Sequence, residues 1–251
     1  MQQVLAAVGA LVVTGGVLLA GQPSTPVTLA SVATAMGADK VRTIEYSGSG
    51  YSFGYQQAPG PGEPWPMFIA DTYKISIDYE VPAMRFESTR AQGESPPRGG
   101  GGQPVAGNPR SVQFLSGPSA WSQSASGRVQ SNPGAVGGRQ QQLWTTPHGL
   151  IRAALARNTQ VSGRTFTLEL NRQRFTVTVG ADSLVESVRY MIDNAVLGDV
   201  PVHLVYSEYK DVAGVKFPTR IIEKTDGFLT WDITIRDVKP NGPCRSSGRK
   251  R

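Results

Sequence analysis

Histidine and cysteine are scarce in this sequence, and their scarcity limits the chemistry that the chain can carry. The 251 residues include two histidines, His148 and His203, and one cysteine, Cys244. A zinc site usually needs several histidine, cysteine or carboxylate ligands close together, and the two histidines belong to no recognisable ligand motif. A single cysteine excludes an internal disulfide. The sequence therefore predicts no metal site and no cofactor.

The usual catalytic motifs are also absent. There is no G-x-S-x-G elbow for a nucleophilic serine, and Cys244 lies near the end of the chain with no base beside it. The glycine run in Arg98–Gly102 is followed by Gln-Pro rather than by the Gly-Lys-Ser/Thr of a phosphate loop. Carboxylates at strand ends, such as Asp71, Asp78 and Asp211, are available for acid–base chemistry, but charged residues normally occupy the exposed face of a sheet. We expect no catalytic residue and no enzyme activity in this chain.

The positive charge of the protein is concentrated at its C-terminus. The net charge is +6, and four of the contributing residues lie in the last ten positions, namely Arg245, Arg249, Lys250 and Arg251. No basic stripe with interleaved aromatic residues runs through the rest of the chain, so nucleic-acid binding is not predicted. We interpret residues 242–251 as a disordered basic tail, although such a tail can also contact nucleic acid or anionic lipid.

The N-terminus is apolar and uncharged. Residues 1–21 contain no charged side chain, and Val4–Ala20 is almost wholly apolar or small. This pattern predicts a signal peptide for export, or alternatively a membrane anchor, followed by a short linker at residues 22–27. The expected location is therefore periplasmic or secreted, with attachment to a membrane through the N-terminal segment as the alternative.

Alternation of apolar and polar residues dominates the remainder, above all between Leu184 and Asn241. A two-residue period is typical of a strand with one buried face. It predicts strands at residues 41–48, 68–81, 84–90, 111–115, 120–122, 161–170, 174–180, 184–193, 203–210, 215–224 and 228–238.

Two segments instead show helical signals. Thr28–Gly37 places four apolar residues on one side and ends at glycine, and Thr145–Asn158 begins with Thr146 as N-cap and Pro147 in the first helical position. Two polar stretches, Ala91–Pro109 and Gln123–Gln142, are expected to be loops. Residues 28–241 thus predict a single α+β domain in which a strongly curved antiparallel sheet, a half-barrel, packs with two or more helices. We expect it to be a monomer.

Aromatic residues on these strands are the candidate ligand-binding residues. A curved sheet covered by helices can enclose a hydrophobic cavity, and the alternative is that the same side chains simply fill the core. The candidates are Tyr46, Phe53, Phe68, Tyr73, Phe86, Trp121, Tyr190 and Trp231.

Three segments of the sequence resemble known families: PGEPWPMF with SPPRGGGGQP, LWTTPHGLIRAAL, and YMIDNAVLGDVPVHLVYSEYKDVAGVKFPTRIIEKTDGF. Together they resemble the N-terminal accessory region of exported bacterial proteins that continue into a metallo-β-lactamase-fold hydrolase. The last segment is also similar in architecture to the lipoprotein-carrier fold of the LolA and LppX kind, in which a half-open barrel holds acyl chains. The resemblance covers roughly residues 35–243, and the histidine-rich metal motif of the hydrolases does not follow.

The resemblance and the residues together indicate a non-catalytic exported domain. Its expected partners are a lipid or another apolar small molecule, or a hydrolase domain for which it serves as an accessory. The alternative is that this chain is part of a zinc hydrolase whose catalytic domain is missing, as a truncated or frame-shifted product would be. A purely structural or vestigial domain without a ligand is the third hypothesis.

Overall fold

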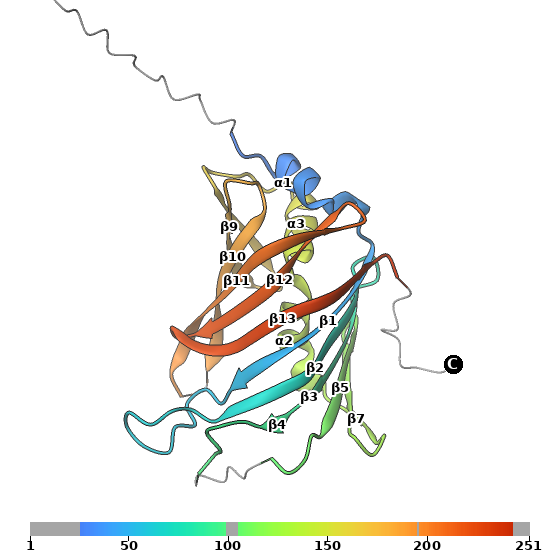
Figure 1. Ribbon diagram of the computed structural model, residues 1–251. Coiled ribbons are helices and arrows are strands. Elements are labelled where there is room, and N and C mark those ends of the chain that lie inside the picture. The colour runs from blue at the N-terminus through green and yellow to red at the C-terminus, as the bar shows by residue number, and fades with distance from the viewer. Residues whose placement is uncertain (1–25, 99–104, 195, 243–251) are drawn as a thin grey trace, which may run out of the picture.

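The computed structural model describes residues 26–98, 105–194 and 196–242, and these build a curved antiparallel sheet around three α-helices (Figure 1). The strand order is β7-β6-β5-β3-β2-β1-β13-β12-β11-β10-β9-β8, with the short β4 paired to β2. Within the described residues β7 and β8 end this order and do not pair with each other, so the sheet is not closed. The prediction of a large curved antiparallel sheet with helices is confirmed.

Most strands lie where the alternation predicts them, although several extend further. The strands are β1 Thr43–Phe53, β2 Met67–Asp78, β3 Ala83–Thr89, β4 Ala91–Gln92, β5 Arg110–Ser116, β6 Ser119–Gln123, β7 Val129–Ser131, β8 Thr165–Leu170, β9 Gln173–Val179, β10 Val185–Asn194, β11 Gly198–Val212, β12 Val215–Thr225 and β13 Phe228–Pro240. Most connections join neighbours in the sheet. The main exception is the segment from β7 to β8, which contains α2 and α3 and links the two ends of the strand order. The first and last long strands, β1 and β13, pair with each other at the middle of the sheet.

Two helices confirm their sequence signals. Helix α1 (Leu29–Met36) begins with a capping box between Thr28 and Ser31 and ends at Gly37, whose φ of 63° is the left-handed conformation that glycine adopts readily. Helix α3 (Pro147–Leu155) begins after Thr146, whose hydroxyl accepts a hydrogen bond from the Gly149 amide at 3.3 Å. Short 3₁₀ turns lie at Ala38–Lys40 and Pro133–Ala135.

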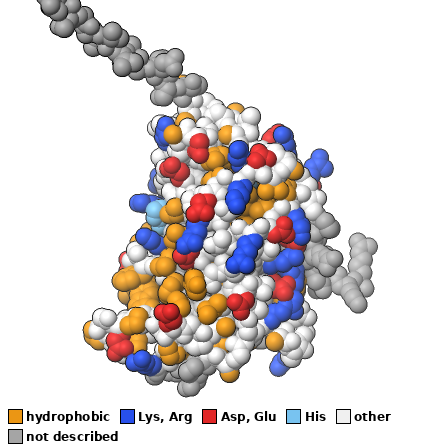
Figure 2. Space-filling view, in the orientation of Figure 1, with side chains coloured by type: hydrophobic (Ala, Val, Ile, Leu, Met, Phe, Trp, Pro, Cys, Tyr) orange, Lys and Arg blue, Asp and Glu red, His pale blue; other side chains and the backbone are white. Residues whose placement is uncertain are grey.

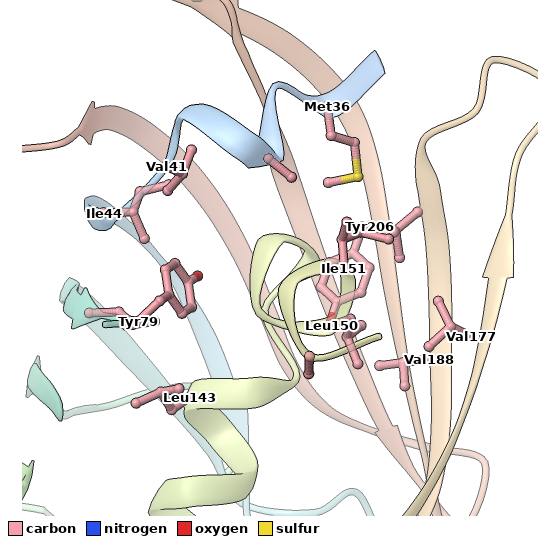
Figure 3. Packing of buried hydrophobic residues seen from close by; sticks show 14 of the residues in the cluster. Met36, Val41, Ile44, Tyr79, Leu143, Leu150, Ile151, Val177, Val188 and Tyr206 are labelled. Carbon is pink, nitrogen blue, oxygen red and sulfur yellow. The ribbon is translucent and has the colours of Figure 1, made fainter. Parts of the chain in front are cut away.

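The core lies on the concave side of the sheet and is organised around α3. Leu150 and Ile151 of this helix are fully buried, and Figure 3 shows them between α1 and the strands that carry Val177 and Val188. Because the sheet curves around the helices, α3 is enclosed on several sides, and its buried residues include even the polar His148. The apolar stripe of α3 therefore anchors the helices inside the curve.

The prediction of a polar loop at Gln123–Gln142 is wrong. This stretch contains β7 and a third helix, α2 (Val136–Trp144). Its sequence is poor in apolar residues, and Leu143 and Arg139 are its buried members. The helix forms because these two side chains are held by the rest of the fold, which local sequence does not reveal.

Several predictions fall outside the described residues: the signal peptide or anchor at 1–21, positions 22–25 of the linker at 22–27, the glycines 99–102 and the basic tail beyond Gly242. The loop expected at Ala91–Pro109 includes β4, and its residues 99–104 are likewise not described. No helix in the described part of the chain has the length and hydrophobicity needed to cross a bilayer.

Candidate functional site

A cavity lies between the concave face of the sheet and the segment that joins α2 to α3. Its volume is about 350 Å³. Seven strands contribute inward-facing side chains to it, and the helical segment closes it from the other side. Its lining comprises Tyr46, Tyr73, Phe86, Gly138, Gln141, Gln142, Thr145, Thr146, Pro147, Tyr190, Ile192, Val202, Leu204, Tyr206, Ile221, Glu223, Thr225, Trp231 and Ile233.

Three aromatic rings form a cluster in the wall of this cavity. Tyr73 of β2, Phe86 of β3 and Trp231 of β13 meet with ring centroids 5.1 Å apart for Tyr73–Phe86, 5.8 Å for Tyr73–Trp231 and 6.5 Å for Phe86–Trp231. All three pairs are edge-to-face, with interplanar angles of 62° to 72°. Edge-to-face packing is a favourable arrangement for aromatic rings. We call these three residues the aromatic cluster.

Further tyrosines fix the helical wall. The hydroxyl of Tyr206 (β11) donates a hydrogen bond to the carbonyl of Thr145, and the hydroxyl of Tyr79 lies 2.7 Å from that of Thr146. Figure 3 shows Tyr206 and Tyr79 on opposite sides of α3. Burial raises the pKa of Tyr206 and of Tyr79 far above the usual phenol range, so both stay neutral hydrogen-bonding groups. The two residues hold the α2–α3 junction over the cavity.

Glu223 of β12 is the one carboxyl among the described residues that line the cavity. Its Oε1 accepts a hydrogen bond from the Thr230 hydroxyl at 2.9 Å, and within the described residues no side chain bonds Oε2. Burial raises the pKa of Glu223 above 4.5, and the Thr230 hydrogen bond opposes this rise. The lining described for the cavity includes no Lys, Arg or His. Glu223 is thus an acid that the fold has placed in an aromatic cavity without a cationic partner.

Five of the eight aromatic residues predicted from the sequence line this cavity, and three do not. The five are Tyr46, Tyr73, Phe86, Tyr190 and Trp231. Whether they bind a ligand stays a prediction.

The other three residues have structural partners elsewhere, which corrects their placement at the cavity. Phe53 is half-buried at the end of β1, and Phe68 lies beneath the Arg90 guanidinium, 3.5 Å from its ring centroid. Trp121 stacks on Phe114 at 5.3 Å. Register explains two of the three. Ser52, and not Phe53, is paired with Trp231, and Ser122, and not Trp121, shares the face of Phe86 through Gln113, so Phe53 and Trp121 lie on the opposite face of the sheet.

Sequence reasoning missed two functional candidates, Tyr206 and Glu223. Both occupy inward positions of their strands, and Glu223 alternates with Ile221 and Thr225, which also line the cavity. A charged residue in phase with the buried residues of a strand is the signal that could have identified Glu223.

The two histidines have separate environments. His148 is fully buried, stacks on Phe217 with centroids 5.8 Å apart, and places Nε2 3.3 Å from the Met36 carbonyl. Burial, aided by the positive charge of Arg152, lowers its pKa to about 4. His203 lies on β11 opposite Arg189 and Lys224 of the neighbouring strands. Within the described residues no group of three or more His, Cys, Asp or Glu is arranged to hold a metal ion.

The carboxylates considered for acid–base chemistry serve local structure instead. Asp78 accepts hydrogen bonds from the Glu80 and Val81 amides, and Asp211 accepts one from the Gly214 amide, so both stabilise turns. The Asp71 carboxylate accepts a hydrogen bond from the Asn108 side chain at 2.8 Å.

Hydrophobic side chains gather at one end of the face shown in Figure 2, over the β12–β13 turn and the β1–β2 loop. Trp65 of that loop stacks on Phe228 at 4.5 Å, and Tyr55 packs on Trp65 at 5.0 Å. Phe228 is nevertheless 51% exposed, as is Leu197 of the β10–β11 turn. These contacts tie the loop to the sheet near one end of the molecule.

Comparison with known proteins yields fold-level likeness alone. No protein-family model matches the chain, and no curated protein matches it. Among solved structures, a LolA superfamily protein from Nitrosomonas europaea has 12% identity, covering 86% of this chain and 95% of its own, with a TM-score of 0.39. A DUF1329 family protein from Desulfovibrio piger has 9% identity, covering 86% of this chain and 94% of its own, with a TM-score of 0.27.

Proposed function

We propose that this chain is a non-catalytic binding domain that holds an apolar or amphiphilic small molecule, such as a lipid, in the cavity between the sheet and the α2–α3 junction. The observation that carries the proposal is the cavity of about 350 Å³ lined by six aromatic side chains. Its size falls within the range of small-molecule sites.

The apolar part of the lining favours a ligand with an apolar body. Such a ligand packs against the aromatic rings and gains dispersion contacts there. The polar groups of the lining, chiefly Gln141, Gln142, Thr145 and Glu223, then orient one end of that ligand.

Export to the periplasm or the outside of the cell, with or without membrane attachment, is part of the proposal and is supported by the uncharged apolar segment at residues 1–21. Service as an accessory to a hydrolase stays a prediction of the sequence resemblance, as does the monomeric state. No feature of the described residues favours either of them over simple ligand binding.

Binding of Nile red, an uncharged dye whose fluorescence rises in apolar surroundings, tests the proposal. Leu204 lines the cavity, so Leu204→Trp should occupy part of it and weaken dye binding by about tenfold, equivalent to about 1.4 kcal/mol. Leu197→Trp is the matched control, because Leu197 is 51% exposed in the β10–β11 turn. Equal dye affinity in all three proteins, each shown by thermal melting to be folded, would exclude the cavity as the binding site.

A further inference from the structure

The lining of the cavity also indicates the chemical class of its ligand. Resting on the proposed function, we propose that the ligand carries a cationic head group, an amine or a quaternary ammonium, which binds between Glu223 and the aromatic cluster. An alkyl or other apolar body then occupies the remainder of the cavity.

The aromatic cluster favours a cationic ligand. Tyr73, Phe86 and Trp231 come from three strands, and their edge-to-face packing keeps them at angles to one another rather than in a parallel stack. All three residues line the cavity. The face of an aromatic ring is electron-rich and attracts an organic cation that lies within about 6 Å of its centroid. A neutral apolar ligand gains no such attraction.

The register of the sheet places an acid beside these rings. Glu223 and Trp231 are directly opposite each other in the β12–β13 ladder. Residues so paired have Cβ atoms about 5 Å apart on the same face of the sheet. The Thr230 hydroxyl holds Oε1 of Glu223, and the carboxylate lines the cavity. One organic cation can therefore contact the carboxylate and the indole together.

The charge of the cavity lining disfavours anionic ligands. A fatty acid, a sulfate or a phosphate would bring a negative charge beside Glu223 into a cavity whose described lining offers no Lys, Arg or His. The other ionisable groups that face Glu223 are the phenols Tyr73, Tyr190 and Tyr206, whose pKa values are raised by burial and which are neutral. An uncompensated charge in such surroundings is costly, whereas a cationic ligand neutralises Glu223 on binding.

Titration calorimetry with three amphiphiles of equal chain length tests the inference. The probes are decyltrimethylammonium, decanoate and decanol, each below the concentration at which it forms micelles or separates. The wild-type protein should bind the cation at least about tenfold more tightly than the other two. Glu223→Gln keeps the size of the side chain and the acceptor for Thr230, and it should weaken cation binding by about tenfold while leaving decanol unchanged.

Two further variants complete the design. Glu169→Gln removes the same charge from an exposed position on β8 and should leave all three affinities unchanged. Trp231→Leu should weaken binding of the cation more than binding of decanol, because leucine retains apolar surface but has no ring face.

The outcomes separate this inference from the proposed function. Equal binding of all three amphiphiles, or tightest binding of decanoate, would overturn the cationic head group while leaving an apolar site intact. The same conclusion follows if the cation binds most tightly but Glu223→Gln has no effect. If none of the three amphiphiles and no Nile red bound to the protein, both proposals would be overturned.

Discussion

At the scale of single residues, the fold places ionisable side chains where their charged forms are disfavoured. Glu223 lines an aromatic cavity, and His148 is fully buried between α1 and Phe217. Nδ1 of His148 has no hydrogen-bond partner among the described residues. The two groups differ in what they can do, because Glu223 faces a space that a ligand can enter and His148 is enclosed by packing.

The buried imidazole gives a prediction about pH. Because burial lowers the pKa of His148 from 6.5 to about 4, the unfolded chain binds a proton between these values and the folded chain does not. Acidification across this window should therefore lower the free energy of unfolding, by about 3 kcal/mol in total. His148→Phe, which can still pack on Phe217, should lose that part of the pH dependence.

Urea denaturation at several pH values between 7 and 4 measures the effect. His203→Gln serves as the control, because His203 lies on a partly exposed strand and its removal should leave most of the slope in place. If His148→Phe and the wild-type protein lost stability in parallel as the pH fell, the buried histidine would not be the group responsible.

At the scale of the elements, α2 shows how tertiary contacts can create a helix that its sequence does not announce. Arg139 is 5% exposed, and its Nη1 donates to the carbonyls of Phe114 at 2.8 Å and Trp121 at 2.7 Å. Its Nη2 donates to the Ser122 hydroxyl at 2.8 Å. The guanidinium thus attaches α2 to β5 and β6, while Gln141 and Gln142 on the same helix reach the cavity.

Arg139→Lys should weaken the attachment of α2 to β5 and β6. A lysine ammonium cannot reproduce the planar fork of donors, so at least one buried carbonyl would lose its partner, at a cost of about 2 kcal/mol in the free energy of unfolding. Arg128→Lys is the matched control, because Arg128 is exposed before β7. The measurement is chemical denaturation, combined with Nile red binding, which should weaken as the helical wall loosens. Unchanged stability would show that the hydrogen bonds of Arg139 are replaceable.

At the scale of the whole molecule, the curvature of the sheet decides where the cavity lies, and β1 is where that curvature is accommodated. Its pairing with β13 shifts register between Ser47 and Gly48, and its pairing with β2 shifts between Gly48 and Gly50. A Cβ atom on Gly50 would lie 2.0 Å from the Asp232 carbonyl oxygen, and one on Gly48 would lie 2.0 Å from that of Thr234. Glycine at these positions permits β13 to approach β1.

Gly50→Ala should therefore destabilise the protein strongly, by more than about 3 kcal/mol, because backbone rather than a flexible side chain obstructs the new methyl group. Gly137→Ala is an instructive control. Gly137 lies in α2 with open space around it, and alanine there should stabilise the helix by up to about 1 kcal/mol. Thermal melts of both variants provide the measurement, and a stable Gly50→Ala protein would show that the sheet can relax without this close approach.

The sequence by itself determined most of the elements. Two-residue alternation located nearly all the strands of the sheet, and Thr28, Gly37, Thr146 and Pro147 marked helix ends, because these signals depend on neighbours within a few positions. It also indicated that aromatic residues on the strands were the candidate ligand contacts.

Only the tertiary structure decided which of those aromatic residues meet, and which polar group accompanies them. Tyr73, Phe86 and Trp231 are brought together by the pairing of β1 with both β2 and β13, whereas the register of β3, β5 and β6 places Trp121 on the opposite face of the sheet. The helix α2, the approach of Tyr206 to the α2–α3 junction and the position of Glu223 depend likewise on contacts between distant segments. Local patterns specify which face of a strand is buried, but the place where two buried faces leave a space is set by register and curvature summed over the whole sheet.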